Sequence, residues 1–115
     1  VMAMYGATAS QVAYLACQTT TNQACCNMIT NSFEEAAYLY FHCMFKQGDI
    51  KRLANGGAQE NLSQELICAQ PIIMCNNIED ICGFAILLRT KIAYAKEICK
   101  LKQLLSMYLS KLINS

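Results

Sequence analysis

The feature that most constrains the fold is one long apolar stripe in the C-terminal third of the chain. Its members recur at intervals of three and four residues, the spacing of one face of an α-helix. An unbroken helix over residues 78–113 would be about 54 Å long, whereas a compact domain of this size has a radius of gyration of about 13 Å. The length favours a break near Gly83 or Arg89–Thr90, and the alternative is that the helix end packs on another chain. The members of the stripe are Ile78, Ile81, Ala85, Leu88, Ile92, Ala95, Ile98, Leu101, Leu105, Tyr108 and Leu112.

The rest of the chain is also expected to be helical. One Pro and five Gly leave few breaks in 115 residues, and strand-like alternation is absent. We therefore predict a single all-α domain over residues 1–115, a compact bundle of about five to six helices. The predicted helices cover residues 2–17, a short stretch at Cys25–Met28, residues 32–48 behind a Ser32/Glu35 capping box, residues 49–54 up to Asn55-Gly56-Gly57, a segment from Asn61 or Ser63 to Pro71, and the stripe behind its cap Asn77.

The composition is apolar and the charge is unevenly spread. Hydrophobic residues make up 55% of the chain and charged residues only 15%, so the chain buries much or presents an apolar surface to a partner. A net charge of +1 gives no general attraction to nucleic acid, and we expect no nucleic-acid partner. From Arg89 to the end, the chain has six basic residues and a single acidic residue, Glu97. The amphipathic helix over residues 88–113 could lie on a membrane surface, and the simpler interpretation is a solvated polar face.

Eight cysteines in a short chain favour disulfides and therefore secretion to the extracellular space. We expect the helical bundle to be held by these disulfides. The alternative is a reduced intracellular helical protein that uses Cys as a small core residue. The cysteines are Cys17, Cys25, Cys26, Cys43, Cys68, Cys75, Cys82 and Cys99.

The sequence offers little for catalysis. His42 is the only histidine, and the adjacent Cys43 would point about 100° away from it on a helix. Cys68, Cys75 and Cys82 are seven residues apart, unlike the close cysteine pairs of zinc sites, and Pro71 interrupts their shared face. We therefore predict a protein that is not an enzyme, with no catalytic residue, no metal and no cofactor.

Two short segments resemble the insect odorant-binding protein family. Residues 40–50 read Tyr-Phe-His-Cys-Met-Phe-Lys-Gln-Gly-Asp-Ile, which is similar to the helix that carries that family's third cysteine. Residues 79–88 read Glu-Asp-Ile-Cys-Gly-Phe-Ala-Ile-Leu-Leu, which is similar to the helix of the fifth cysteine. The cysteine order from 17 to 99 looks like the divergent fire-ant venom allergen branch of that family. The chain departs from the common pattern at Leu39, where the second cysteine is expected, and near Lys91, where the sixth is expected.

The resemblance implies a secreted bundle of about six helices around an apolar cavity. It implies a disulfide between Cys17 and Cys43, which would tie the first helix to the third. It also implies different partners for Cys25 and Cys26, one of which could belong to a second chain, so a homodimer through either residue is open.

The leading functional hypothesis is a secreted carrier of small apolar molecules. It depends on aromatic and Met side chains that stand on helices without a reactive group near them, because ligand pockets are mostly apolar. The first alternative is a helical protein–protein interaction module that dimerises through its C-terminal amphipathic helix, with reduced thiols and an exposed apolar patch. The second is a secreted membrane-active or toxin-like protein. The expected ligand-binding residues are Tyr38, Phe41, Met44, Phe45, Met74, Phe84, Leu88 and Tyr94.

Overall fold

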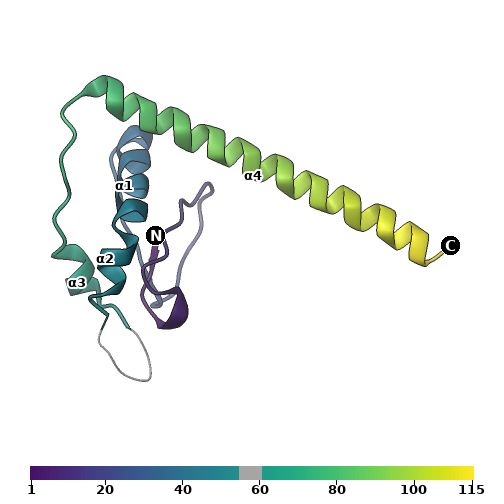
Figure 1. Ribbon diagram of the computed structural model, residues 1–115, viewed down its shortest axis with the longest axis horizontal. Helices are drawn as coiled ribbons and strands as arrows, with labels where there is room; N and C mark the ends of the chain where they lie inside the picture. The colour runs from purple at the N-terminus through teal and green to yellow at the C-terminus, as the bar shows by residue number, and fades with distance from the viewer. Residues whose placement is uncertain (55–60) are drawn as a thin grey trace. The chain divides into compact units, whose positions relative to one another are not determined.

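The computed structural model describes residues 1–54 and 61–115, and their contacts form two compact units. Unit 1 is Val1–Ala85 and unit 2 is Ile86–Ser115. The expected helix end at Asn55-Gly56-Gly57 lies outside the described residues. The elements in chain order are β1 (Met2–Ala3), the 3-10 helix η1 (Gly6–Thr8), β2 (Cys25–Cys26), α1 (Phe33–Phe45), α2 (Gln47–Lys51), α3 (Gln64–Cys68) and α4 (Ile78–Ile113) (Figure 1).

The predicted all-α bundle of five to six helices is wrong. The described residues contain four α-helices, one 3-10 helix and a small antiparallel sheet, in which Met2 pairs with Cys26. Residues 2–17 do not form the predicted helix, because Gly6 and Ser10 adopt positive φ angles of 69° and 76° that a right-handed helix does not allow. Met2 and Met4 are both buried and Tyr5 is exposed, so strand-like alternation, which was predicted to be absent, is present there.

Three of the predicted helix starts are confirmed, those of α1, α3 and α4. The short helix predicted at Cys25–Met28 does not form, because Cys25–Cys26 pairs as strand β2, and the helix predicted over residues 49–54 is α2, Gln47–Lys51. The Ser32 hydroxyl accepts the backbone N–H of Glu35 at 3.1 Å, and the Glu35 carboxylate in turn accepts the backbone N–H of Asn31 at 3.0 Å. The Ser63 hydroxyl caps α3 by accepting the backbone N–H of Leu66 at 3.2 Å. At the start of α4, the Asn77 side-chain oxygen accepts the backbone N–H of Glu79 at 2.9 Å. These short polar side chains satisfy backbone donors that the first turn of a helix leaves unpaired.

The predicted break in the C-terminal helix is wrong. Residues Ile78–Ile113 form one α-helix of 36 residues that continues through Gly83 and through Arg89–Thr90. A single glycine costs only about 1 kcal/mol in a helix interior. The Thr90 hydroxyl donates to the carbonyl of Ile86 at 2.9 Å, one turn back, so its polar group is satisfied within the helix.

The predicted disulfides are absent, and all eight cysteines are free thiols. The bridge expected between Cys17 and Cys43 does not form; Cys17 is exposed and Cys43 is buried. Cys82 and Cys99 both lie in α4. Their 17-residue separation corresponds to about 25 Å along a helix, far beyond the reach of a disulfide.

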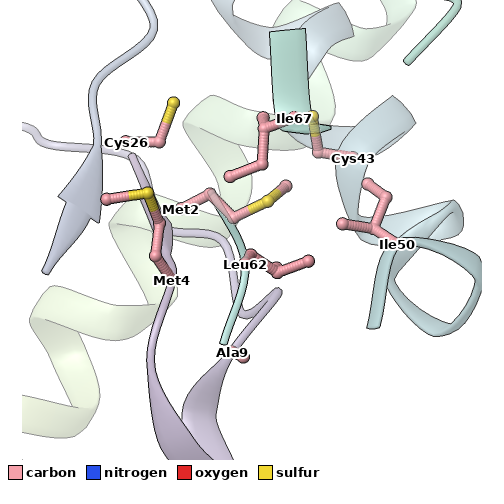
Figure 2. Packing of buried hydrophobic residues seen from close by; sticks show 8 residues of the cluster. All are labelled: Met2, Met4, Ala9, Cys26, Cys43, Ile50, Leu62 and Ile67. Atoms are coloured by element: carbon pink, nitrogen blue, oxygen red, sulfur yellow. The ribbon is translucent and has the colours of Figure 1, made fainter. Parts of the chain in front are cut away.

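The core of unit 1 is built from segments that are distant in sequence. Figure 2 shows the Met2, Leu62, Ile67 and Cys43 side chains converging from β1, the segment before α3, α3 and α1. The backbone N–H of Leu62 donates to the carbonyl of Met4 at 2.6 Å, which ties the N-terminal segment to the segment before α3. The cluster therefore depends on long-range pairing. Its members are Met2, Met4, Ala9, Cys26, Cys43, Ile50, Leu62 and Ile67.

Candidate functional site

Five of the eight predicted ligand-binding side chains line one apolar groove in unit 1. The groove encloses about 500 Å³, within the range of small-molecule sites. The Phe84 ring contacts the Tyr38 ring edge-on at 5.4 Å between centroids and the Phe41 ring at 5.9 Å. We call this the aromatic groove. Its lining residues are Tyr38, Phe41, His42, Met44, Phe45, Ile73 and Phe84.

Two side chains of α1 hold the wall of the aromatic groove in place. His42 accepts the backbone N–H of Ile73 at its Nε2 atom, at 3.1 Å. Tyr38 donates its hydroxyl to the backbone carbonyl of the same residue. Both polar groups of Ile73 are therefore paired with side chains one turn apart on α1. His42, the only histidine of the chain, thus helps to position the backbone at Ile73.

The other three predicted ligand residues do not join the groove. Met74 is exposed and does not line the aromatic groove, although it follows Ile73 directly. Leu88 is buried and Tyr94 is exposed, and both belong to unit 2. The sequence thus predicted the groove residues of α1 and Phe84, but it also predicted three ligand residues, Met74, Leu88 and Tyr94, that do not line the groove.

A second cavity in unit 1 was not expected from the sequence. It encloses about 460 Å³, and three cysteines, Cys26, Cys43 and Cys68, contribute to its wall. These cysteines come from β2, α1 and α3, so only the tertiary pairing of the segments brings them to one cavity. The one signal in the sequence was the apolar character of their neighbours, and we attributed the cysteines to disulfides instead. We call this the thiol cavity.

Two thiols of this cavity, Cys43 and Cys26, have a raised pKa. Burial raises the pKa of the Cys43 thiol above its ordinary value. Burial also raises the pKa of the Cys26 thiol, and the neighbouring Cys68 raises it further. A raised pKa lowers the fraction of thiolate, which is the nucleophilic form of cysteine.

Unit 2 presents an exposed apolar stripe with a seven-residue repeat. Intervals of four, three, four, three and four residues separate its six members, which is the pattern of the a and d positions of a coiled coil. Each of the six is between 52% and 73% exposed. We call this the heptad stripe. Positions a are Ile98, Leu105 and Leu112, and positions d are Tyr94, Leu101 and Tyr108.

The residues that flank the heptad stripe carry both charges and further apolar side chains. Glu97 and Leu104 occupy g positions, and Lys102 and Leu109 occupy e positions. Glu97 contacts Lys100 at 3.3 Å within the same helix. Because both of those side chains are largely exposed, that ion pair contributes little to stability.

Within residues 1–54 and 61–115, no three His, Cys, Asp or Glu side chains are grouped so that they could hold a metal ion. Over the same ranges, no helix combines the length and the apolar character needed to cross a membrane. The candidate sites are the aromatic groove and the thiol cavity of unit 1 and the heptad stripe of unit 2. Unit 1 also has a further pocket of about 420 Å³ whose wall includes Tyr14 and Phe33.

Comparison with known proteins leaves these sites to be interpreted by their own geometry, because no family model, no curated protein and no solved structure matches the chain.

Proposed function

We propose that the chain is a helical protein–protein interaction module that associates with a second copy of itself through the heptad stripe. One observation carries the proposal: six large apolar side chains at a and d spacing all lie exposed on one helix. Water-exposed apolar residues in such an arrangement indicate an interaction surface, because burying them releases free energy in proportion to the area covered.

The composition of unit 2 supports this interpretation. Apart from its last two residues, unit 2 consists of helix α4, so nothing inside unit 2 covers the stripe. Most of the stability of a protein helix comes from the packing of its apolar face. A second helix with the same repeat would supply that packing by inserting its a and d side chains between those of the first.

Charge complementarity at the edges of the heptad stripe, at Glu97 and Lys102, favours a second copy as the partner, while the rest of unit 2 is basic. The stripe is bordered by Glu97 on its g side and Lys102 on its e side, so each copy offers both members of an ion pair. The free thiols also support this function, because the interaction module was expected to have reduced thiols. The secreted carrier was expected to have its cysteines in disulfides.

Sedimentation of the whole chain under reducing conditions tests the proposal. Wild-type protein should shift from one chain to a larger assembly as its concentration rises. Leu105→Glu places like charges in the middle of the stripe and should raise the dissociation constant more than about a hundredfold. Gln103→Glu adds the same charge at position f, away from the stripe, and should associate like wild type. A wild-type chain that stays monomeric at every concentration overturns the proposal.

The aromatic groove supports a second candidate function, the binding of a small apolar molecule. Its wall is formed almost entirely by aromatic and aliphatic side chains, and five of them were expected from the sequence. Phe45 is 84% exposed, so Phe45→Ser should leave the fold intact while removing part of the groove.

Fluorescence of N-phenylnaphthylamine, a neutral apolar probe, tests this second function. Wild-type protein should enhance the fluorescence, and a fatty acid, a terpenoid or an alkaloid should displace the probe. Phe45→Ser should weaken binding about tenfold, whereas Tyr5→Ser, at an exposed aromatic residue outside the groove, should not. Folded wild-type protein that takes up no probe would remove this function.

A further inference from the structure

We infer that two copies of the chain pair through their heptad stripes in parallel and in register. This inference rests on the proposed self-association and adds the direction of the second helix and the contacts it makes. Equal helices can pair in two directions, and different flanking residues meet in each.

In a parallel pair without offset, each g residue lies beside the e residue five positions further along the second chain. Glu97 then meets Lys102 of the second copy, and Leu104 meets Leu109 of the second copy. Symmetry produces each contact twice. The parallel pair thus has two ion pairs and two apolar contacts at its edges, with no like charges opposed.

In an antiparallel pair, g residues face g residues and e residues face e residues. If Ile98 is opposite Tyr108 of the second copy, Glu97 meets Lys111, but Lys102 meets Lys102 of the other chain. Like charges at this position are unfavourable, and Leu109 then faces the much smaller Ala95. The contacts at the e and g positions therefore favour the parallel pair over the antiparallel pair, although the a and d side chains can pack in either.

One pair of core positions, Ile98 and Leu101, agrees with a two-stranded parallel pair. Ile98 at a is followed by Leu101 at d, a combination that favours two parallel strands. The next a position toward the N-terminus is Lys91, so the apolar repeat begins at Tyr94. This polar boundary disfavours a shift of one helix along the other by a heptad, because the shift would place Lys91 against Ile98.

Charge exchange across the edge tests the direction. In the parallel pair, Glu97→Lys alone and Lys102→Glu alone each turn two ion pairs into two like-charge contacts. Each should raise the dimer dissociation constant about tenfold at low salt, and added salt should reduce the difference. The doubly exchanged chain, Glu97→Lys with Lys102→Glu, restores opposite charges and should dimerise like wild type.

The outcomes separate this inference from the function on which it rests. In an antiparallel pair, the Glu97→Lys substitution of the doubly exchanged chain sets a second positive charge against Lys111, so association stays weakened. That result would overturn the parallel direction while self-association stands. A wild-type trimer or tetramer in sedimentation would also overturn the two-stranded pair alone. A wild-type monomer would overturn both.

Discussion

Units 1 and 2 both carry large apolar side chains, but they cover them in different ways. In unit 1, Met2 and Leu62 are almost fully buried because segments far apart in sequence pack around them. In unit 2, the heptad stripe stays mostly exposed on one helix. Large apolar side chains can thus stabilise the fold of one chain when they are buried within it, or an assembly of chains when they are exposed. Unit 1 should unfold independently of protein concentration, whereas the stability of unit 2 should depend on it.

The largest effect is expected in the core of unit 1. Met2 has no exposed surface, so Met2→Ala should leave a cavity and lower the free energy of unfolding by about 2–5 kcal/mol. Chemical denaturation monitored by tyrosine fluorescence measures this. Ile29→Ala, at a residue that is 96% exposed, is the control and should change stability by less than about 0.5 kcal/mol. Equal losses in the two variants would erase the contrast between buried and exposed residues.

The next effect belongs to the heptad stripe. Leu101→Ala shortens a d-position side chain in both copies and should weaken association by about 2–3 kcal/mol. The helical circular-dichroism signal of wild type should melt at higher temperature as protein concentration rises, and the variant should lose most of this dependence. A wild-type melting temperature that is independent of concentration would contradict the assignment of unit 2 to an assembly.

A smaller gain is expected at Ser10. Its φ angle is 76°, a region that glycine adopts without strain, and its buried hydroxyl has no hydrogen-bond partner among the described residues. Ser10→Gly should therefore raise the free energy of unfolding by about 1 kcal/mol. Ser10→Ala removes the hydroxyl but keeps the strained backbone, so it should gain less. A loss of stability in Ser10→Gly would mean that the hydroxyl has a favourable role.

The smallest effect concerns pH in the thiol cavity. Burial raises the pKa of Cys43 and of Cys26, so the folded chain holds these protons more tightly than the unfolded chain does. The resulting stabilisation is full below the thiol pKa of the unfolded chain and is lost as pH rises through the pKa of the folded protein. Denaturation at increasing alkaline pH should show this loss, and a Cys26→Ala/Cys43→Ala chain should lose less. If the free energy of unfolding fell equally steeply with pH in wild type and in the variant, the result would contradict this prediction.

The sequence predicted local structure well where local chemistry decides it. Ser32 and Asn77 are predicted as caps, and Ser63 as one of two alternatives with Asn61, because a short polar side chain at a helix start acts within a few residues. Met2 was misassigned to a helix because its strand depends on Cys26, which is distant in sequence. Long-range pairing of this kind leaves almost no signal in a two-residue strand.

The continuous helix α4 was missed for a different reason. Its periodicity is clear, but the length of an unbroken helix beside the size of a compact domain favoured a break over the alternative that the helix end packs on another chain. The structure leaves Leu101 and Leu112 exposed on a continuous helix, so the favoured break is wrong. For the aromatic groove, α1 periodicity identified Tyr38 and Phe41, whereas the role of Ile73 depends on a backbone segment that no pattern located.

The distribution of methionine sulfur has a consequence for oxidative damage. Met74 and Met107 face solvent, whereas Met2 and Met4 lie in the interior of unit 1. Peroxide should convert the two solvent-facing thioethers to sulfoxides first, where a polar oxygen is readily accommodated. The interior pair becomes reactive only when unit 1 opens, and a sulfoxide there would hinder its closing again. Mild oxidation would thus modify the solvent-facing methionines and leave the fold intact. The rate at which the fold is lost in stronger oxidant would follow the rate at which the interior of unit 1 opens.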